Sequence, residues 1–122
     1  MIIQLEEAKR TLQGMTGDIE DLGSALKIDR LRDEAEELEQ KTLMPNFWDD
    51  TENSGKILRE LKRIKSTLEE YTALKRSLDD AIALADMGIE ENDESVTDEV
   101  TAEVEKIRTC VERMRLETLL SG

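Results

Sequence analysis

Apolar residues recur at alternating spacings of three and four along this chain, and no other feature constrains its fold as strongly. The first stretch contains Leu5, Ala8, Leu12, Met15, Ile19, Leu22 and Leu26. The longest contains Ile57, Leu61, Ile64, Leu68, Tyr71, Leu78, Ile82 and Ala85, with Lys75 as the one inward position out of type. A helix with this pattern carries one narrow hydrophobic stripe, which a partner helix has to cover. The spacing therefore predicts packed amphipathic helices.

The stripes and the residues that break helices divide the chain into four predicted segments. Their ranges are 2–22, 29–43, 51–87 and 97–120. Gly23 is expected to end the first helix, although the first two segments could instead be one bent helix. Asp49 or Asp50 is expected to cap the third helix, and Gly88 to end it in the left-handed conformation. Because the connections are short, we predict an all-α, antiparallel bundle of three to four helices with a long coiled-coil-like helical hairpin.

Composition and charge narrow the classes of function. The formal charge is −13, with 17 basic and 30 acidic residues, which disfavours binding of the whole domain to a phosphate backbone or an anionic membrane. Cys110 is the only cysteine, so we expect no disulfide and a reduced, cytoplasmic setting. The sequence contains no histidine, phosphate-binding glycine loop or calcium loop. We therefore expect no enzymatic activity, no cofactor and no metal site.

Phe47 and Trp48 form the most specific local feature, because two large rings follow one another in a short proline-containing connection. One interpretation is that they plug the junction where helices meet. The alternative is an exposed anchor for a partner, since tryptophan is a preferred residue at interfaces. Either way, we predict a helix-junction anchor at Phe47 and Trp48.

One basic stretch stands out on this acidic chain. Lys56, Arg59 and Arg63 share one face of the predicted third helix. These side chains could pair with the acid-rich neighbouring helices. They could also contact RNA phosphates, because a local basic stripe can bind phosphate where the overall charge cannot. Lys75, at an inward-facing position, is expected to extend its amine to solvent or to fix the packing register.

The segment Pro45-Asn46-Phe47-Trp48-Asp49-Asp50 follows a short acidic helix and precedes a long Lys/Leu-rich one, and the chain closes on Leu119-Leu120-Ser121-Gly122. In these motifs the whole chain resembles the bacterial type 2 peptide chain release factors. The resemblance implies that residues 1–122 form a single helical N-terminal domain. The core domains, with the codon-reading tripeptide and the catalytic Gly-Gly-Gln loop, are absent from this sequence.

The resemblance also implies a function and partners. It implies a docking domain in translation termination that binds near the stalk base of the large ribosomal subunit and catalyses no peptidyl-tRNA hydrolysis by itself. Its other implied partners are the remainder of the release factor and the class II release-factor GTPase. Under the resemblance, the RNA that Lys56, Arg59 and Arg63 could contact is ribosomal RNA. The alternative is a structural coiled-coil or chaperone-like scaffold that dimerises through its hydrophobic stripes. Sedimentation would separate a compact monomer from a tight dimer.

Overall fold

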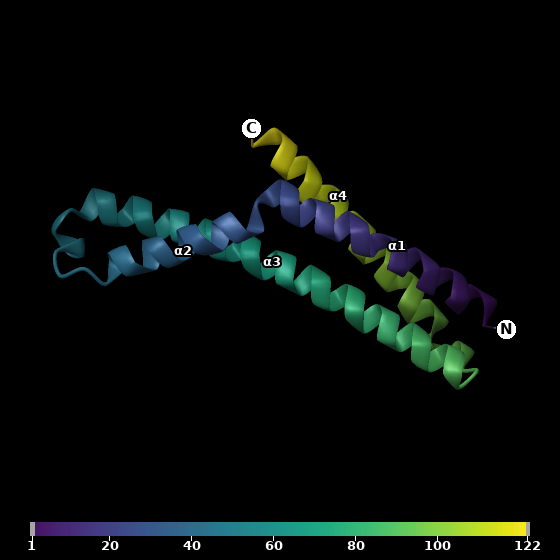
Figure 1. Cartoon of the computed structure of the whole chain (residues 1–122). Helices are drawn as coiled ribbons and strands as arrows, with labels where there is room; N and C mark the ends of the chain where they lie inside the picture. The colour runs from purple at the N-terminus through teal and green to yellow at the C-terminus, as the bar shows by residue number, and fades with distance from the viewer. Residues whose placement is uncertain (1, 122) are drawn as a thin grey trace. The chain divides into compact units, whose positions relative to one another are not determined.

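A computed structural model describes residues 2–121, and every regular element in that part of the chain is helical (Figure 1). The elements are α1 (Ile3–Leu26), α2 (Ile28–Thr42), the 3-10 helix η1 (Phe47–Asp49), α3 (Thr51–Glu90), the 3-10 helix η2 (Glu94–Val96) and α4 (Thr97–Leu120). The all-α helical bundle expected from the sequence is confirmed. Gly122, the last residue of the Leu-Leu-Ser-Gly ending, lies outside the described residues.

The helices form two compact units, and α3 contributes one half to each. Unit 1 combines the residues up to Ala25 with those from Ala73 onward, and unit 2 comprises Leu26–Thr72. The assignment of residues 1–122 to one N-terminal domain stays a prediction. Each unit has its own buried side chains.

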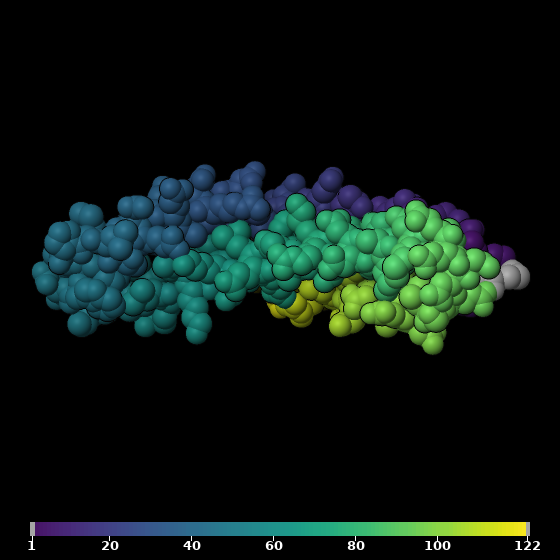
Figure 2. All heavy atoms as spheres, turned by 90° about the horizontal axis from the view of Figure 1, so that it is seen from below, coloured from purple at the N-terminus to yellow at the C-terminus, as the bar shows by residue number. Residues whose placement is uncertain are grey.

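Unit 1 is a three-helix bundle of α1, the second half of α3 and α4. The space beside Gly88, near the end of α3, is occupied by Leu5 from the start of α1 and by Val96 from the turn before α4. Both α1 and α4 therefore run antiparallel to α3 and parallel to each other (Figure 1). Figure 2 shows side chains of α4 (yellow-green) packed along this half of α3 (green). The buried stripe of α4 is Val100, Val104, Ile107, Val111 and Met114.

The turn that ends α3 differs from the one expected. Gly88 lies inside the helix, and the left-handed residue is Asn92, with φ 52°. The Asn92 N–H donates to the Ile89 carbonyl at 3.2 Å, and the Asp93 N–H donates to the Gly88 carbonyl at 2.8 Å. This pair of bonds is a Schellman motif, which satisfies carbonyls at the helix end. The prediction that Gly88 adopts the left-handed conformation is wrong, because the glycine is needed for its size instead.

Gly88 lets α1 and the α3–α4 turn approach closely. A Cβ atom at this position would lie 2.6 Å from Val96 Cγ2 and 2.9 Å from Leu5 Cδ1. Real contacts are never that short between well-packed carbon atoms, whose favourable separation is about 3.5–4.0 Å. Only glycine fits here without a shift of the neighbouring side chains.

Unit 2 is a hairpin of α2 and the first half of α3. Its core cluster consists of Ala35 from α2 with Leu61 and Ile64 from α3, and partly buried leucines from both helices pack around it. These leucines are Leu31, Leu38 and Leu68. An ion pair between Lys65 and Glu39 also joins the two helices of this unit. The predicted stripe of α3 is therefore the surface that meets α2 in this unit.

The break between α1 and α2 lies later than the sequence suggested. The helix continues through the buried Gly23 to Leu26, and Lys27 then takes left-handed angles, with φ 57° and ψ 51°. The two segments are thus separate helices and not one bent helix. The end expected at Gly23 is wrong because the glycine lies on the packed face of α1, where its small size suits a buried position.

The buried stripe of α3 changes register by one residue between Tyr71 and Leu74. Up to Tyr71 the predicted positions hold. Beyond it Leu78 and Ala85 are buried as predicted. Leu74 and Ala81 are buried in place of the expected Lys75 and Ile82. Lys75 is exposed, so its predicted inward position is wrong. Leu68, Tyr71 and Leu74 follow one another at two successive spacings of three residues, where the pattern otherwise alternates between three and four. The effect is that of a three-residue insertion in a coiled coil, which shifts the hydrophobic positions.

Candidate functional site

The candidate site lies in unit 2, where the chain turns from α2 into α3. Phe47 and Trp48, on η1, contact each other edge to face, with ring centroids 4.9 Å apart and planes at 83°. Phe47 is buried, whereas 64% of Trp48 is exposed. Phe47 therefore matches the packing interpretation, but burial of both rings is contradicted at Trp48. The role of the pair as an anchor for a partner stays a prediction.

Backbone and side-chain hydrogen bonds hold this turn. The hydroxyl of the buried Ser54 lies within donor distance of the Phe47 carbonyl and of the Asp50 carbonyl, the latter at 2.9 Å. The Asp50 carboxylate accepts a hydrogen bond from the Asn53 N–H at 3.1 Å, so Asp50 is the N-cap of α3. Asp50 is one of the two residues predicted for this role. These bonds fix the backbone that carries the exposed Trp48.

Two further apolar side chains in the connection between α2 and α3 are exposed. Leu43 and Met44, which follow α2, are 75% and 57% exposed. We call Leu43, Met44 and Trp48 the tip surface. Next to it lies a pocket of about 370 Å³, lined by Lys41, Met44, Asn46, Phe47, Asp49, Asp50, Asn53 and Ile57. An exposed aromatic among aliphatic side chains with a polar surround has the anatomy of a protein-binding surface.

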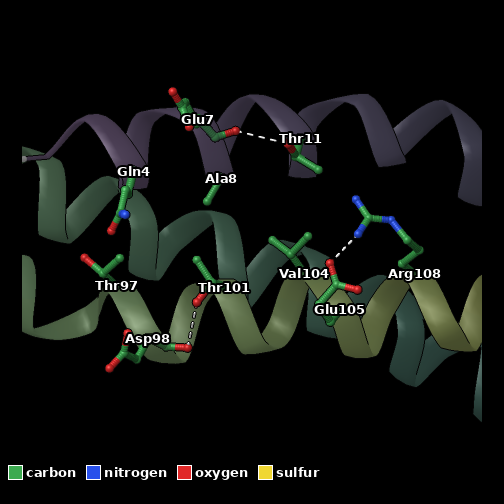
Figure 3. Close-up of a pocket in the computed structure, with 10 residues that line it drawn as sticks. All are labelled: Gln4, Glu7, Ala8, Thr11, Thr97, Asp98, Thr101, Val104, Glu105 and Arg108. Atoms are coloured by element: carbon green, nitrogen blue, oxygen red, sulfur yellow. Dashed lines mark hydrogen bonds and ion pairs between the residues drawn. The ribbon is translucent and has the colours of Figure 1, made fainter.

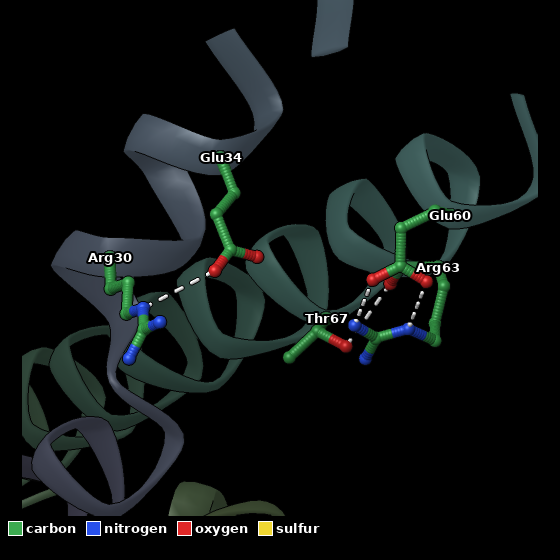
Figure 4. A network of polar contacts seen from close by, with 5 residues as sticks. All are labelled: Arg30, Glu34, Glu60, Arg63 and Thr67. Carbon is green, nitrogen blue, oxygen red and sulfur yellow. Dashed lines mark hydrogen bonds and ion pairs between the residues drawn. The ribbon is translucent and has the colours of Figure 1, made fainter. Parts of the chain in front are cut away.

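The three basic residues singled out in the sequence divide into two groups. Arg63 pairs with Glu60 on its own helix, with Nε–Oε2 at 3.1 Å and Nη2–Oε1 at 2.5 Å (Figure 4). Figure 4 also shows the Arg30–Glu34 pair of α2, whose charged atoms are 3.3 Å apart. Lys56 and Arg59 are exposed and have no carboxylate partner among the described residues.

Hydrogen bonding between Glu60 and Arg63 also sets their ionisation. It lowers the pKa of the Glu60 carboxyl and raises the pKa of the Arg63 guanidinium, and the charge of Glu34 raises the latter further. Both groups therefore stay charged, and the positive charge of Arg63 is paired with the carboxylate of Glu60. The interpretation as intramolecular pairing thus fits Arg63, while Lys56 and Arg59 remain available for an external phosphate. The ribosome contact itself stays a prediction for all three.

The described residues provide surfaces for binding, and they form no recognised arrangement of catalytic or metal-binding side chains. Among residues 2–121, no three His, Cys, Asp or Glu side chains are grouped so that they could hold a metal ion. None of the helices described is long and apolar enough to cross a bilayer. The site residues predicted from the sequence did not include Leu43, Met44 or Ser54. The available signal was Leu43-Met44 directly before Pro45, two apolar residues outside any helical stripe.

Comparison with known proteins finds long matches to one group of relatives. The chain is 30% identical over 122 residues to peptide chain release factor 2 of Clostridium perfringens strain SM101, covering 100% of this chain and 33% of that protein. It is 28% identical over 116 residues to the Streptomyces avermitilis protein of the same name, covering 95% and 32%. For the Mycobacterium sp. strain KMS protein of that name, the identity is 35% over 100 residues, covering 80% and 27%.

These matches and a family model agree on the same region. The chain spans about a third of the length of the curated relatives it matches. No solved structure matches it significantly. The model of the PCRF domain matches residues 31–122, which include the whole second segment of unit 1, from Ala73 onward, and nearly all of unit 2. This sequence is therefore a member of the PCRF domain family.

Proposed function

We propose that this chain acts in translation termination as a ribosome-docking domain of a class I peptide chain release factor, and that it hydrolyses no peptidyl-tRNA by itself. The observation that carries the proposal is the match of the whole chain to proteins named peptide chain release factor 2. Under this proposal the chain works in the cytoplasm, where its partner the ribosome is found. Chemistry and codon reading would belong to the remainder of the factor.

The tip surface supports docking to a protein component. Trp48 presents most of its ring while Phe47, buried beneath it, holds the edge-to-face contact. A rigidly supported tryptophan can bury a large apolar area on binding at little cost in conformational entropy. In our proposal this surface contacts protein at the stalk base of the large subunit, or the class II release-factor GTPase.

Lys56 and Arg59 supply the second contact. Both lie one to two turns into α3, on the helix that begins at the tip surface, and neither has a carboxylate partner in the described chain. An exposed cation that binds an RNA phosphate releases counterions, so its contribution falls as salt rises. The proposed contact is therefore a local, salt-sensitive one on an acidic protein.

Cosedimentation with ribosomes tests the docking proposal. Trp48→Ala should weaken binding through the tip surface, and Lys56→Glu with Arg59→Glu should weaken it in a salt-dependent way. The control is Arg10→Glu with Arg76→Glu, which changes two exposed cations of unit 1 by the same total charge. Equal binding by all these variants would refute docking through unit 2.

A release assay tests the second part of the proposal. The chain is incubated with ribosomes that carry peptidyl-tRNA at a stop codon, and we expect no peptide release above background. Release at a rate comparable to that of a full-length factor would overturn the assignment of the chemistry to other domains.

The scaffold alternative gains no support from the packing. A scaffold that dimerises through its stripes needs them available to a second copy. Here the stripe residues Leu12 and Ile107 of unit 1, and Ile64 of unit 2, are almost completely buried within their own units. A tight dimer in sedimentation would restore the scaffold alternative.

A further inference from the structure

A groove runs between α1 and α4 in unit 1, on the side of the bundle that α3 does not cover. One stretch, of about 510 Å³, is lined by Glu7, Ala8 and Thr11 of α1 and by Val104 and Arg108 of α4, among others (Figure 3). A second stretch of about 370 Å³ shares Thr11 and Arg108 with the first and continues toward the ends of both helices. Because α1 and α4 are parallel, the two stretches form one long groove, which we call the α1–α4 groove.

The floor of the groove is apolar and nearly buried, so that only a thin line of it reaches solvent. Ala8 and Met15 of α1 and Val104 and Val111 of α4 line it, with 6–8% of each residue exposed. The stripe residues directed at α3 are more deeply buried, for example Leu12 at 0% and Ile107 at 2%. The floor therefore offers a narrow apolar strip of the kind that a helix contributes to a groove.

The rim of the groove is predominantly acidic. Its carboxylates outnumber its cations by five to two. The acids are Glu7, Asp18, Asp98, Glu105 and Glu112, and the cations are Arg108 and Arg115. Arg108 is already paired with Glu105, as Figure 3 shows. The rim is thus complementary to a positively charged ligand and repels a phosphate backbone.

Gly14 leaves the groove open at its middle. This residue lines the second stretch, and a Cβ atom placed on it would find nothing within 4 Å. A glycine inside a helix costs about 1 kcal/mol relative to alanine, and its lack of a side chain leaves room for another backbone to approach.

We propose that the α1–α4 groove binds a basic amphipathic helix of a partner protein. The apolar face of that helix would cover Met15 and Val111, its backbone would pass near Gly14, and its Lys and Arg side chains would reach Asp18 and Glu112. A helix in this place adds a fourth member to the three-helix unit and follows the ordinary helix-in-groove mode of recognition. The inference does not rest on the ribosome-docking proposal, which concerns unit 2.

Charge argues against the other occupants. A second copy of this chain also carries a net charge of −13, so two copies repel each other. Nucleic acid would meet the acidic rim with charge of the same sign. A basic helix is the one class of ligand that satisfies both the apolar floor and the rim.

Two synthetic peptides test the proposal on the whole chain. The first is a helical peptide of about 18 residues, long enough to cover about 27 Å at 1.5 Å per residue, with one leucine face and lysines beside it. The second has every lysine replaced by glutamate. Fluorescence anisotropy should detect binding of the lysine peptide, weaker at higher salt, and none of the glutamate peptide. Absence of lysine-peptide binding, or equal binding of both peptides, would overturn the proposal.

A matched pair of glycine substitutions locates the binding. Gly14→Arg places bulk and positive charge in the groove, whereas Gly17→Arg adds the same side chain to α1 at a glycine that is equally open but does not line the groove. Both changes remove a glycine from a helix interior and should leave folding intact. Gly14→Arg should weaken binding of the lysine peptide by at least about tenfold, and Gly17→Arg by less than about twofold. Equal losses would refute binding in the groove.

A charge-reversal pair controls for unspecific attraction to an acidic protein. Asp18→Lys with Glu112→Lys alters the rim, and Asp79→Lys with Asp80→Lys alters an exposed part of α3 to the same extent. Either pair raises the formal charge from −13 to −9, since each substitution adds two charges. Only the first pair should abolish peptide binding. If the free chain dimerises and Gly14→Arg abolishes the dimer, the proposal is overturned and the groove is assigned to a second copy.

Discussion

The hydroxyl of Ser54 donates to the carbonyl oxygen of Phe47, seven residues earlier in the chain, and both residues are buried. Ser54 is the single buried polar residue of the described chain. Its hydrogen bond ties the first turn of α3 to η1, the segment that presents Trp48. The shape of the tip surface thus depends on one serine.

Ser54→Ala should therefore destabilise the protein, because it leaves the buried carbonyl of Phe47 without a donor. A loss of about 1–3 kcal/mol is expected, and urea unfolding followed by circular dichroism measures it. Ser66→Ala, at an exposed position of the same helix, is the control and should stay within about 0.5 kcal/mol of the parent chain. Equal stabilities of the two variants would contradict a structural role for the Ser54 hydroxyl.

Phe47 and Trp48 should respond differently to truncation. Phe47→Ala empties a buried position and should cost about 3–5 kcal/mol. Trp48→Ala removes a mostly exposed ring and only the edge-to-face contact, so about 0.5–1.5 kcal/mol is expected. The quantity to compare is the free energy of unfolding in urea. A larger cost at Trp48 than at Phe47 would mean that the exposures of the two rings are reversed in solution.

Two glycines in helices should give opposite results on change to alanine. Gly88→Ala should lower stability by about 1–3 kcal/mol, because the added carbon would press on Val96 and Leu5. Gly14→Ala meets open space and should raise stability by about 1 kcal/mol. Thermal and urea unfolding of both variants provide the comparison. Stabilisation by Gly88→Ala would show that the turn after α3 is looser than described.

The thiol of Cys110 should react slowly in the folded chain. Burial raises its pKa above the ordinary value, and the carboxylate of Glu117 raises it further, so less thiolate is present at a given pH. Reaction with a disulfide reagent at pH 8 should be slower in the native chain than in urea. Glu117→Gln should lower the pKa and speed the native reaction slightly, since burial is the larger cause. An unchanged rate on unfolding would contradict the burial of this thiol.

The sequence predicted the helices well because their hydrophobic spacing reports directly on packing. The stripe of α4, from Val100 to Met114, has the same alternating spacing of four and three residues, and it is buried. The start of that helix at Thr97 and its end at Leu120 agree with the predicted range. The cap of α3 was narrowed to Asp49 or Asp50 from their place just before the third stripe, and the structure shows it to be Asp50. Such features depend on neighbours in the chain, which a sequence displays.

The errors concern features that depend on distant residues. Gly23 and Gly88 resemble helix ends in sequence, but each lies within a helix on a packed face, as the buried Gly23 and the near contact of Gly88 with Leu5 illustrate. The helix breaks fall at Lys27 and near Asn92, where no glycine marks them. The exposure of Trp48 likewise depends on which of two adjacent rings faces the core.

The parallel course of α1 and α4 has a practical consequence for labelling. Each helix has 24 residues, hence a length of about 36 Å, and both start at the same end of unit 1. A fluorophore attached near Ile3 and another near Leu120 would therefore report on opposite ends of this unit. Energy transfer between such a pair would stay low while unit 1 is intact. It would rise if α4 detached and its end folded back toward the start of α1.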